Sequence, residues 1–321
     1  MDSLLGNFIV LLLLLLTMGK SASWALRAAI SLSHAVGWSA FAVSVVVVCV
    51  SILPEAIVSA LAAAGGVPAL GLGTLLGSNV ADLTLVFGVV ALLSPRALTV
   101  QSAFIKKDHL YLAFLALPLA LGFGGAYSRL DGVLLIASSV FFLFLMRERA
   151  AAGGRMPINL NGFTFAKSIA VLLTALAVLA ASSFYTVEYA VMLARGLGMA
   201  PALIGLLVIA IGTTLPELLF SLRAARKRHT TLALGDILGT VIADATLVLG
   251  VMALIRPFSF NPRFIILTGF FMLLGGIFSL SLLRSGRALT RGEGAMLVAF
   301  YAAFAALEFL LRDWTPAIGI K

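Results

Sequence analysis

Apolar residues fill the chain in stretches of about twenty residues, separated by short polar breaks. A helix of that length crosses the roughly 30 Å hydrocarbon core of a bilayer. The stretches place ten spans, at 4–32, 40–64, 69–93, 109–126, 130–146, 164–195, 201–222, 232–255, 264–283 and 292–311. The pattern therefore predicts an all-α polytopic membrane protein with ten transmembrane helices.

The two halves of the chain repeat one another. A gapless shift of 162 residues lays 51–95 on 213–257 with 21 identities in 45 positions. Apolar bias can align leucines by chance, but this shift also aligns Pro54-Glu55 with Pro216-Glu217 and Asp82 with Asp244. We predict two five-helix repeats, residues 1–146 and 163–321, joined by a cytoplasmic linker at 147–162.

An odd number of spans in each repeat means that the second repeat enters the membrane from the opposite side, as in many secondary transporters. Basic residues in the polar breaks divide thirteen to six between the two sides. The richer side is expected to be cytoplasmic, which places both termini outside. It carries Arg96, Lys106, Lys107, Arg147, Arg149, Arg155, Arg223, Arg226, Lys227, Arg228, Arg284, Arg287 and Arg291.

The composition excludes a soluble protein. Hydrophobic residues make up 62% of the chain and charged residues 11%, whereas soluble domains carry about 25% charged residues. The net charge of +9 is explained by the cytoplasmic loops, so it does not indicate nucleic-acid binding. The single cysteine, Cys49, excludes a disulfide within the chain.

Acidic residues inside the membrane are the strongest functional signal. A charge at the bilayer centre costs about 2.5–3.5 kcal/mol on insertion scales and marks a functional site by default. Pairing with buried basic residues is the structural alternative, but only Lys20 and Lys167 are remote candidates. The acidic residues that lie well inside predicted spans are Glu55, Asp82, Glu217 and Asp244.

The surroundings of these carboxylates favour a cation. Pro54 and Pro216 each remove a helix hydrogen bond and leave carbonyl oxygens free one turn earlier. A site built only of oxygen ligands suits hard cations such as Ca²⁺, Mg²⁺ and Na⁺, whereas zinc or copper recruits His or Cys. The hydroxyls next to the carboxylates belong to Ser51, Thr213, Thr214, Ser78 and Thr240.

Three further acidic residues carry weaker signals. Asp236 lies near a predicted cytoplasmic end, and Glu308 lies near the end of the last span, so both are expected at the membrane interface. Glu188 has no acidic counterpart at Leu26. It is expected either to face a cation pathway or to bond between helices.

The paired motifs resemble the calcium/cation antiporter superfamily, and its prokaryotic sodium/calcium exchangers in particular. The second repeat, GTTLPELLFS (212–221) followed by LGDILGTVIADATLVLG (234–250), is similar to that family's α-repeat. VSILPEAIVS (50–59) and LGTLLGSNVADLTLVFG (72–88) form a more divergent copy. The five-plus-five layout also matches, so the resemblance covers nearly the whole chain.

The resemblance implies a secondary antiporter of a prokaryotic cell membrane that exchanges Ca²⁺ for Na⁺ by alternating access at a midplane site. It implies that Glu55 and Glu217 bind Ca²⁺ with backbone carbonyls around Ser51 and Thr213. It also implies that the first and sixth helices slide across a static core. We expect a monomer with no cofactor and no nucleic-acid partner. The implied flanking sodium sites comprise Ser78, Thr214, Thr240, Asp82 and Asp244.

The chain departs from the family pattern at three places. Ile52 replaces the second hydroxyl residue of the family's Gly-Thr-Ser-Leu-Pro-Glu, and Asp82 stands where many relatives have Asn. The family's Gly-Asn reads Gly73-Thr74 and Gly235-Asp236 here. Four clustered carboxylates cannot all stay ionised without cations. Exchange of Ca²⁺ or another divalent cation for H⁺ is therefore the alternative.

Two other classes of protein are alternatives, an intramembrane protease and a passive channel. An intramembrane aspartyl protease would carry Gly-x-Gly-Asp, whereas this chain has Ala233-Leu234-Gly235-Asp236, and a protease would leave the paired glutamates unexplained. We therefore expect no enzymatic activity. A passive channel is the other alternative, and single-channel currents would reveal it.

Overall fold

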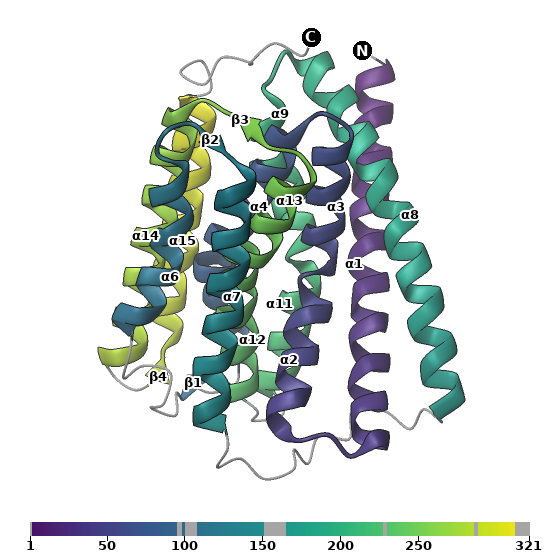
Figure 1. The fold of residues 1–321 in the computed structure, drawn as a ribbon, viewed down its shortest axis with the longest axis vertical. Coiled ribbons are helices and arrows are strands. Elements are labelled where there is room, and N and C mark those ends of the chain that lie inside the picture. The colour runs from purple at the N-terminus through teal and green to yellow at the C-terminus, as the bar shows by residue number, and fades with distance from the viewer. Residues whose placement is uncertain are drawn as a thin grey trace.

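Helices run side by side along the molecule in the computed structural model (Figure 1), which describes residues 2–94, 98–99, 108–150, 165–226, 230–285 and 288–311. The first half contains α1 Asp2–Val36, α2 Ala40–Ser51, α3 Leu53–Ala64, α4 Pro68–Val80, the π-helical η1 Ala81–Val86, α5 Phe87–Leu93, α6 Asp108–Gly122 and α7 Arg129–Ala150. The second contains α8 Phe165–Leu197, α9 Pro201–Ile204, η3 Gly205–Ile209, α10 Ala210–Thr213, α11 Leu215–Arg226, α12 Thr230–Ala243, η4 Asp244–Val248, α13 Leu249–Ile255, α14 Pro262–Ser285 and α15 Arg291–Leu310.

Helical structure occupies every predicted apolar range. Within the described residues, seven helices are long and apolar enough to cross a membrane, or eight if the pair α2 and α3, bent by 45°, counts as one span. The described part of α6 is apolar but shorter. Helix α7 continues to Ala150, so it includes the first residues of the predicted linker, and the rest of that linker lies outside the described residues.

The distribution of polarity is that of a membrane protein. Large apolar side chains such as Phe141 and Phe144 are 54% exposed on the outer surface. Buried positions include many hydroxyls and carboxylates, among them Ser59 and Thr74, both fully buried. In a bilayer, lipid covers the apolar exterior while polar groups find partners inside the protein. The chain is therefore an all-helical integral membrane protein.

The two halves share their irregularities as well as their helices. Ile52 caps the end of α2, and Thr214, one repeat length of 162 residues later, caps the end of α10. Both cap residues have a helical φ and a ψ near zero. Pro54 and Pro216 follow two residues later and cannot donate a backbone hydrogen bond. The π-helical segments η1 and η4 also fall at equivalent positions.

Short strands join the halves at opposite ends of the molecule. Strand β1 Leu98–Thr99 pairs antiparallel with β4 Ala288–Leu289, and β2 Ala126–Tyr127 pairs with β3 Phe258–Ser259. The first pair lies at the lower end in Figure 1 and the second near the upper end. Each ladder therefore combines one strand from each half.

Glycines allow the halves to pack closely at two equivalent places. A Cβ atom on Gly88 of α5 would lie 2.7 Å from the carbonyl oxygen of Gly294 in α15. A Cβ atom on Gly250 of α13 would lie 2.8 Å from the carbonyl oxygen of Gly132 in α7. Both approaches are backbone to backbone, which explains why these positions are glycine.

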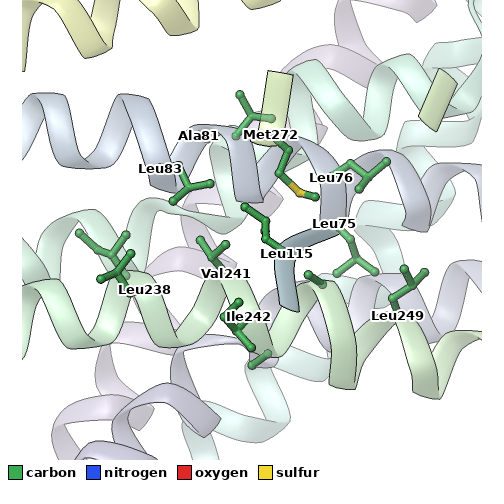
Figure 2. Close-up of a cluster of buried hydrophobic side chains, with 14 of the residues drawn as sticks. Leu75, Leu76, Ala81, Leu83, Leu115, Leu238, Val241, Ile242, Leu249 and Met272 are labelled. Atoms are coloured by element: carbon green, nitrogen blue, oxygen red, sulfur yellow. The ribbon is translucent and has the colours of Figure 1, made fainter. Parts of the chain in front are cut away.

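An apolar core fills the space between the central helices of the two halves. Helices α1 and α8 pack against each other at one side of the molecule, while α14 and α15 stand at the opposite side (Figure 1). Between them, α3, η1, α11, α12 and η4 hold the acidic residues of the two motifs. Figure 2 shows core side chains of this region, including Leu75, Leu76, Leu83, Leu115, Leu238, Val241, Ile242, Leu249 and Met272.

Candidate functional site

The helix breaks place Glu55 and Glu217 in the first turns of α3 and α11. One turn after each glutamate, a serine ties its helix to the next. The Ser59 hydroxyl donates to the Gly71 carbonyl oxygen at 3.3 Å, and the Ser221 hydroxyl donates to the Ala233 carbonyl oxygen at 3.3 Å. The two glutamates are thus held in equivalent frames.

Asp82 and Asp244 lie at the starts of η1 and η4. A π-helical turn widens the helix and often occurs at functional sites. Just beyond the aspartates, the Thr84 hydroxyl bonds to the Val80 carbonyl oxygen at 2.5 Å, and the Thr246 hydroxyl bonds to that of Ile242 at 2.6 Å. These threonines satisfy backbone acceptors of the preceding turn in both halves.

The four predicted carboxylates are brought together in the interior of the molecule. None is more than 2% exposed. Glu55 interacts electrostatically with Asp82, Glu217 and Asp244, and Asp82 also interacts with Glu217 and Asp244. Carboxylates from both halves therefore share one region.

Hydroxyls of one half face carboxylates of the other. The Thr213 hydroxyl contacts Glu55, and the Ser78 hydroxyl contacts Asp244. Both hydroxyls also donate within their own helices, Thr213 to the Ala210 carbonyl oxygen at 3.1 Å and Ser78 to that of Leu75 at 3.0 Å. Two other predicted hydroxyl ligands do the same. Thr214 donates to the Ile211 carbonyl oxygen at 3.1 Å, and Thr240 lies 2.9 Å from that of Ile237. All four hydroxyls are therefore engaged as donors within their own helices.

Each carboxylate keeps one oxygen without a hydrogen-bond partner. The oxygens are Glu55 Oε2, Asp82 Oδ1, Glu217 Oε2 and Asp244 Oδ1, all shielded from solvent. No lysine or arginine in the described part of the chain forms an ion pair with these carboxylates. Lys20, a remote candidate from the sequence, has its ammonium over the Trp24 ring, 5.3 Å from the ring centroid. Buried acceptors without donors favour a positively charged ligand.

The geometry suits a ligand shell of mixed oxygens. Among the described residues, no three His, Cys, Asp or Glu side chains converge tightly enough to form a metal centre by themselves. Hard cations accept backbone carbonyls and hydroxyls together with carboxylates. The backbone carbonyls around the two breaks and the hydroxyls of Thr213 and Ser78 are the groups that would supplement the carboxylates.

The structure corrects the expectation for Asp236. This residue is not at a membrane interface: it is 2% exposed and accepts a 3.0 Å hydrogen bond from the Ser51 hydroxyl. It also interacts electrostatically with Asp82 and Glu217, so it joins the same acidic region. The sequence did hold an indication of this: Asp236 lies eight residues, about two helical turns, before Asp244.

The structure also places the other two weaker candidates, Glu308 and Glu188. Glu308, expected at the interface, is 1% exposed and accepts a 2.6 Å hydrogen bond from Thr268. Its helix, α15, packs against α14, so burial between helices explains the difference. Glu188 lies exposed on α8, outside the buried acidic region, and no hydrogen bond from it to another helix is seen in the described part of the chain.

Comparison with known proteins agrees with this architecture. The sequence profile of the sodium/calcium exchanger protein family matches residues 6–147 and 167–310. The sodium/calcium exchanger MaX1 of Methanosarcina acetivorans is 28% identical over 352 residues, covering 95% of this chain and 99% of its own. The inner membrane protein YrbG of Escherichia coli is 30% identical over 271 residues, covering 81% of this chain and 83% of its own.

Solved structures show the same fold. The sodium-calcium exchanger NCX_Mj, in crystals soaked without Na⁺ and Ca²⁺, superposes with a TM-score of 0.63 and 26% identity. The superposition covers 96% of this chain and all of the NCX_Mj chain. The matched profile spans both halves and includes every residue of the acidic region. The chain is a member of the sodium/calcium exchanger protein family.

Proposed function

We propose that this protein is a secondary active antiporter that exchanges Ca²⁺ for Na⁺ by alternating access at a midplane site. One observation carries the proposal. Carboxylates from both halves meet in the interior, each with an unpartnered oxygen, and within the described ranges no basic side chain pairs with them. A dehydrated cation is the ligand that such a set of acceptors stabilises.

In this site, Glu55 and Glu217 are the central Ca²⁺ ligands, supported by backbone carbonyls around Ser51 and Thr213. Their equivalent positions at the helix breaks support the assignment. The resemblance to the exchangers supports a role for the flanking groups in binding Na⁺. These groups are Asp82, Asp244, Ser78, Thr214 and Thr240.

The layout belongs to the same proposal. Residues 1–146 and 163–321 are two inverted five-span repeats, and 147–162 is a cytoplasmic linker. Equivalent irregularities in the two halves support the repeat, and the placement of the strand ladders supports the inversion. Arg284 and Arg291 flank β4 at one end, whereas Arg129 and Arg256 adjoin β2 and β3 at the other.

Sidedness follows from these charges. The end that holds β1 and β4 is the cytoplasmic one, so both termini are outside. Nine of the nineteen loop residues behind the charge bias, including Lys106 and Lys227, lie outside the described residues. The protein acts as a monomer in a prokaryotic membrane, with inorganic cations as its only substrates and no cofactor.

Alternating access would come from α1 and α8. These helices pack on each other along one side of the molecule (Figure 1). The Ser168 hydroxyl of α8 also donates a 3.1 Å hydrogen bond to the Ser31 hydroxyl of α1. A pair of long apolar helices can slide over the core as a unit, because lipid replaces lipid along its outer face.

Exchange of a divalent cation for H⁺ is a second candidate, favoured by the additional carboxylates. Asp82 stands where many exchangers have Asn, Asp236 is buried beside it, and Ile52 offers no hydroxyl. More carboxylates and fewer neutral oxygens provide more positions for a proton and fewer for Na⁺.

Calcium flux in proteoliposomes tests both candidates. Uptake is measured under a sodium gradient and then under a pH gradient, with Glu55→Gln and Glu217→Gln as site variants. Sodium-driven uptake that both variants abolish is the expected result. Uptake that follows the pH gradient and ignores sodium would establish the second candidate instead. Full activity in both variants would refute the assigned site.

A further inference from the structure

Asp236 is a buried carboxylate that the family motif does not explain. Its Oδ1 accepts the Ser51 hydroxyl at 3.0 Å, and its Oδ2 has no partner although it is shielded from solvent. A buried carboxylate oxygen without a donor is costly unless a ligand satisfies it. The exposed fraction of the residue is 2%, so water at the surface cannot do so.

Asp236 lines the same helix face as the central site. Thr240 lies four residues after it and Asp244 four residues further along the chain. Side chains at this spacing share a face, and eight residues of helix span about 12 Å. Asp236 therefore lies on the side of Asp244 nearer to the start of α12, and it interacts electrostatically with Asp82 and Glu217.

The equivalent position in the other half is built differently. One repeat length before Asp236 stands Thr74, whose hydroxyl bonds to the Leu70 carbonyl oxygen at 3.0 Å. A Cβ atom on Gly205 would lie 2.9 Å from the Thr74 backbone nitrogen, so η3 packs tightly against α4 there. Thr74 therefore brings neither a carboxylate nor an unpartnered oxygen to its side of the site.

We propose that Asp236 is a fifth cation-binding carboxylate, which forms with Ser51 a subsite for a hard cation between the start of α12 and the central site. Its Oδ2 and the lone pairs of the Ser51 hydroxyl are the ligands. The subsite has no equivalent at Thr74, so the two faces of the exchanger bind Ca²⁺ differently. This inference rests on the proposed exchange function.

The test compares Ca²⁺ uptake in membrane vesicles of both orientations. Labelling of Thr230→Cys in a Cys49→Ala background identifies the face that carries the start of α12. Asp236→Asn keeps the shape and the acceptor for Ser51 but removes the charge. We expect it to raise the half-saturating Ca²⁺ concentration about tenfold at that face, since ligand charge sets affinity in such sites, and to change it much less at the other face.

Thr74→Val is the matched control, and it should leave both faces unchanged. Equal changes at the two faces in Asp236→Asn, or no change at either, would overturn the subsite. If the wild type moves no Ca²⁺ from either face, the exchange function fails instead. The subsite is then decided by the thermal stabilisation that Ca²⁺ gives the purified protein: a smaller effect in Asp236→Asn supports it, and an equal effect overturns it.

Discussion

The Thr268 hydroxyl donates a 2.6 Å hydrogen bond to Glu308 Oε1, and both side chains are buried where α14 packs against α15. Neither residue belongs to the acidic motifs. The bond satisfies a carboxyl oxygen that would otherwise lack a partner in an apolar environment. Its role is therefore to hold two helices together at a distance from the cation site.

Loss of this bond should destabilise the protein without changing ion selectivity. We expect Glu308→Ala to lower the free energy of unfolding by about 0.6–2 kcal/mol, the range measured for hydrogen bonds between membrane helices. Thermal unfolding in detergent measures the effect. Glu308→Gln is the control because its amide oxygen can still accept from Thr268, and a loss as large as that of the alanine variant would contradict the assigned role.

Close packing at Gly294 gives a second prediction. An added Cβ atom would lie 2.8 Å from the Gly88 carbonyl oxygen and 2.9 Å from the Ala91 Cβ. We expect Gly294→Ala to cost about 1–3 kcal/mol, because the helices must separate. Gly292, on the same helix, has no atom within 4 Å of its Cβ position. Gly292→Ala should be neutral or slightly stabilising, and equal melting temperatures for the two variants would be inconsistent with the packing.

Ile52 gives a third prediction, about coupling. It is 5% exposed and equivalent to Thr214 in the other half. Ile52→Thr supplies the missing hydroxyl, and one added oxygen ligand worth about 0.5–1.5 kcal/mol changes affinity two- to tenfold. We therefore expect a lower half-activating Na⁺ concentration for Ca²⁺ efflux from proteoliposomes. Thr214→Val should shift it in the opposite direction.

An unchanged sodium dependence in both Ile52→Thr and Thr214→Val would separate these hydroxyls from sodium binding. Gel-filtration profiles and melting temperatures show whether each variant keeps its fold, so a shift in sodium dependence can be read as a change at the site.

Disulfide cross-links test the sliding of α1 and α8. The Ser31 and Ser168 hydroxyls are 3.1 Å apart, and a Cβ atom on Gly19 would lie 3.4 Å from the Leu215 Cβ. The Gly19–Leu215 distance is near the Cβ separation of a disulfide, about 3.5–4.5 Å. At Ser31 and Ser168 the two Oγ atoms, whose places the sulfur atoms of cysteines would take, already face each other. In a Cys49→Ala background, oxidation of Ser31→Cys/Ser168→Cys joins the two moving helices and should preserve transport. Oxidation of Gly19→Cys/Leu215→Cys joins α1 to the core and should stop it.

Reduction should restore transport in the second double variant. Transport that continues with α1 covalently fixed to Leu215→Cys would show that this helix does not slide, even if the site assignment is right.

The sequence predicted the positions of the helices well because the bilayer leaves few choices. Each backbone group must be satisfied within a helix, so apolar length and polar breaks define the elements. The repeat also located the irregular positions, since Pro54 and Pro216 follow the breaks at Ile52 and Thr214. The grouping of Glu55, Asp82, Glu217 and Asp244 followed from their depth in the spans.

Contacts between segments far apart in the chain could not be predicted from the sequence. Asp236 and Ser51 are 185 residues apart, and distance from a predicted span end gave no indication that α2 covers this part of α12. Glu308 was misassigned for the same reason, because its burial depends on α14. The π-helical segments were not predicted either, since their hydrophobic pattern resembles that of an ordinary helix over so few residues.

The strand ladders impose an order on synthesis. Strand β1 ends at Thr99, but its partner β4 begins only at Ala288, so the ribosome must add almost the whole second half before that ladder can close. Strand β2 likewise cannot pair until Phe258 and Ser259 of β3 have been synthesised. The first half thus enters the bilayer with two of its connections unpaired, and the late arrival of its partner segments makes assembly of the two halves a step that follows insertion.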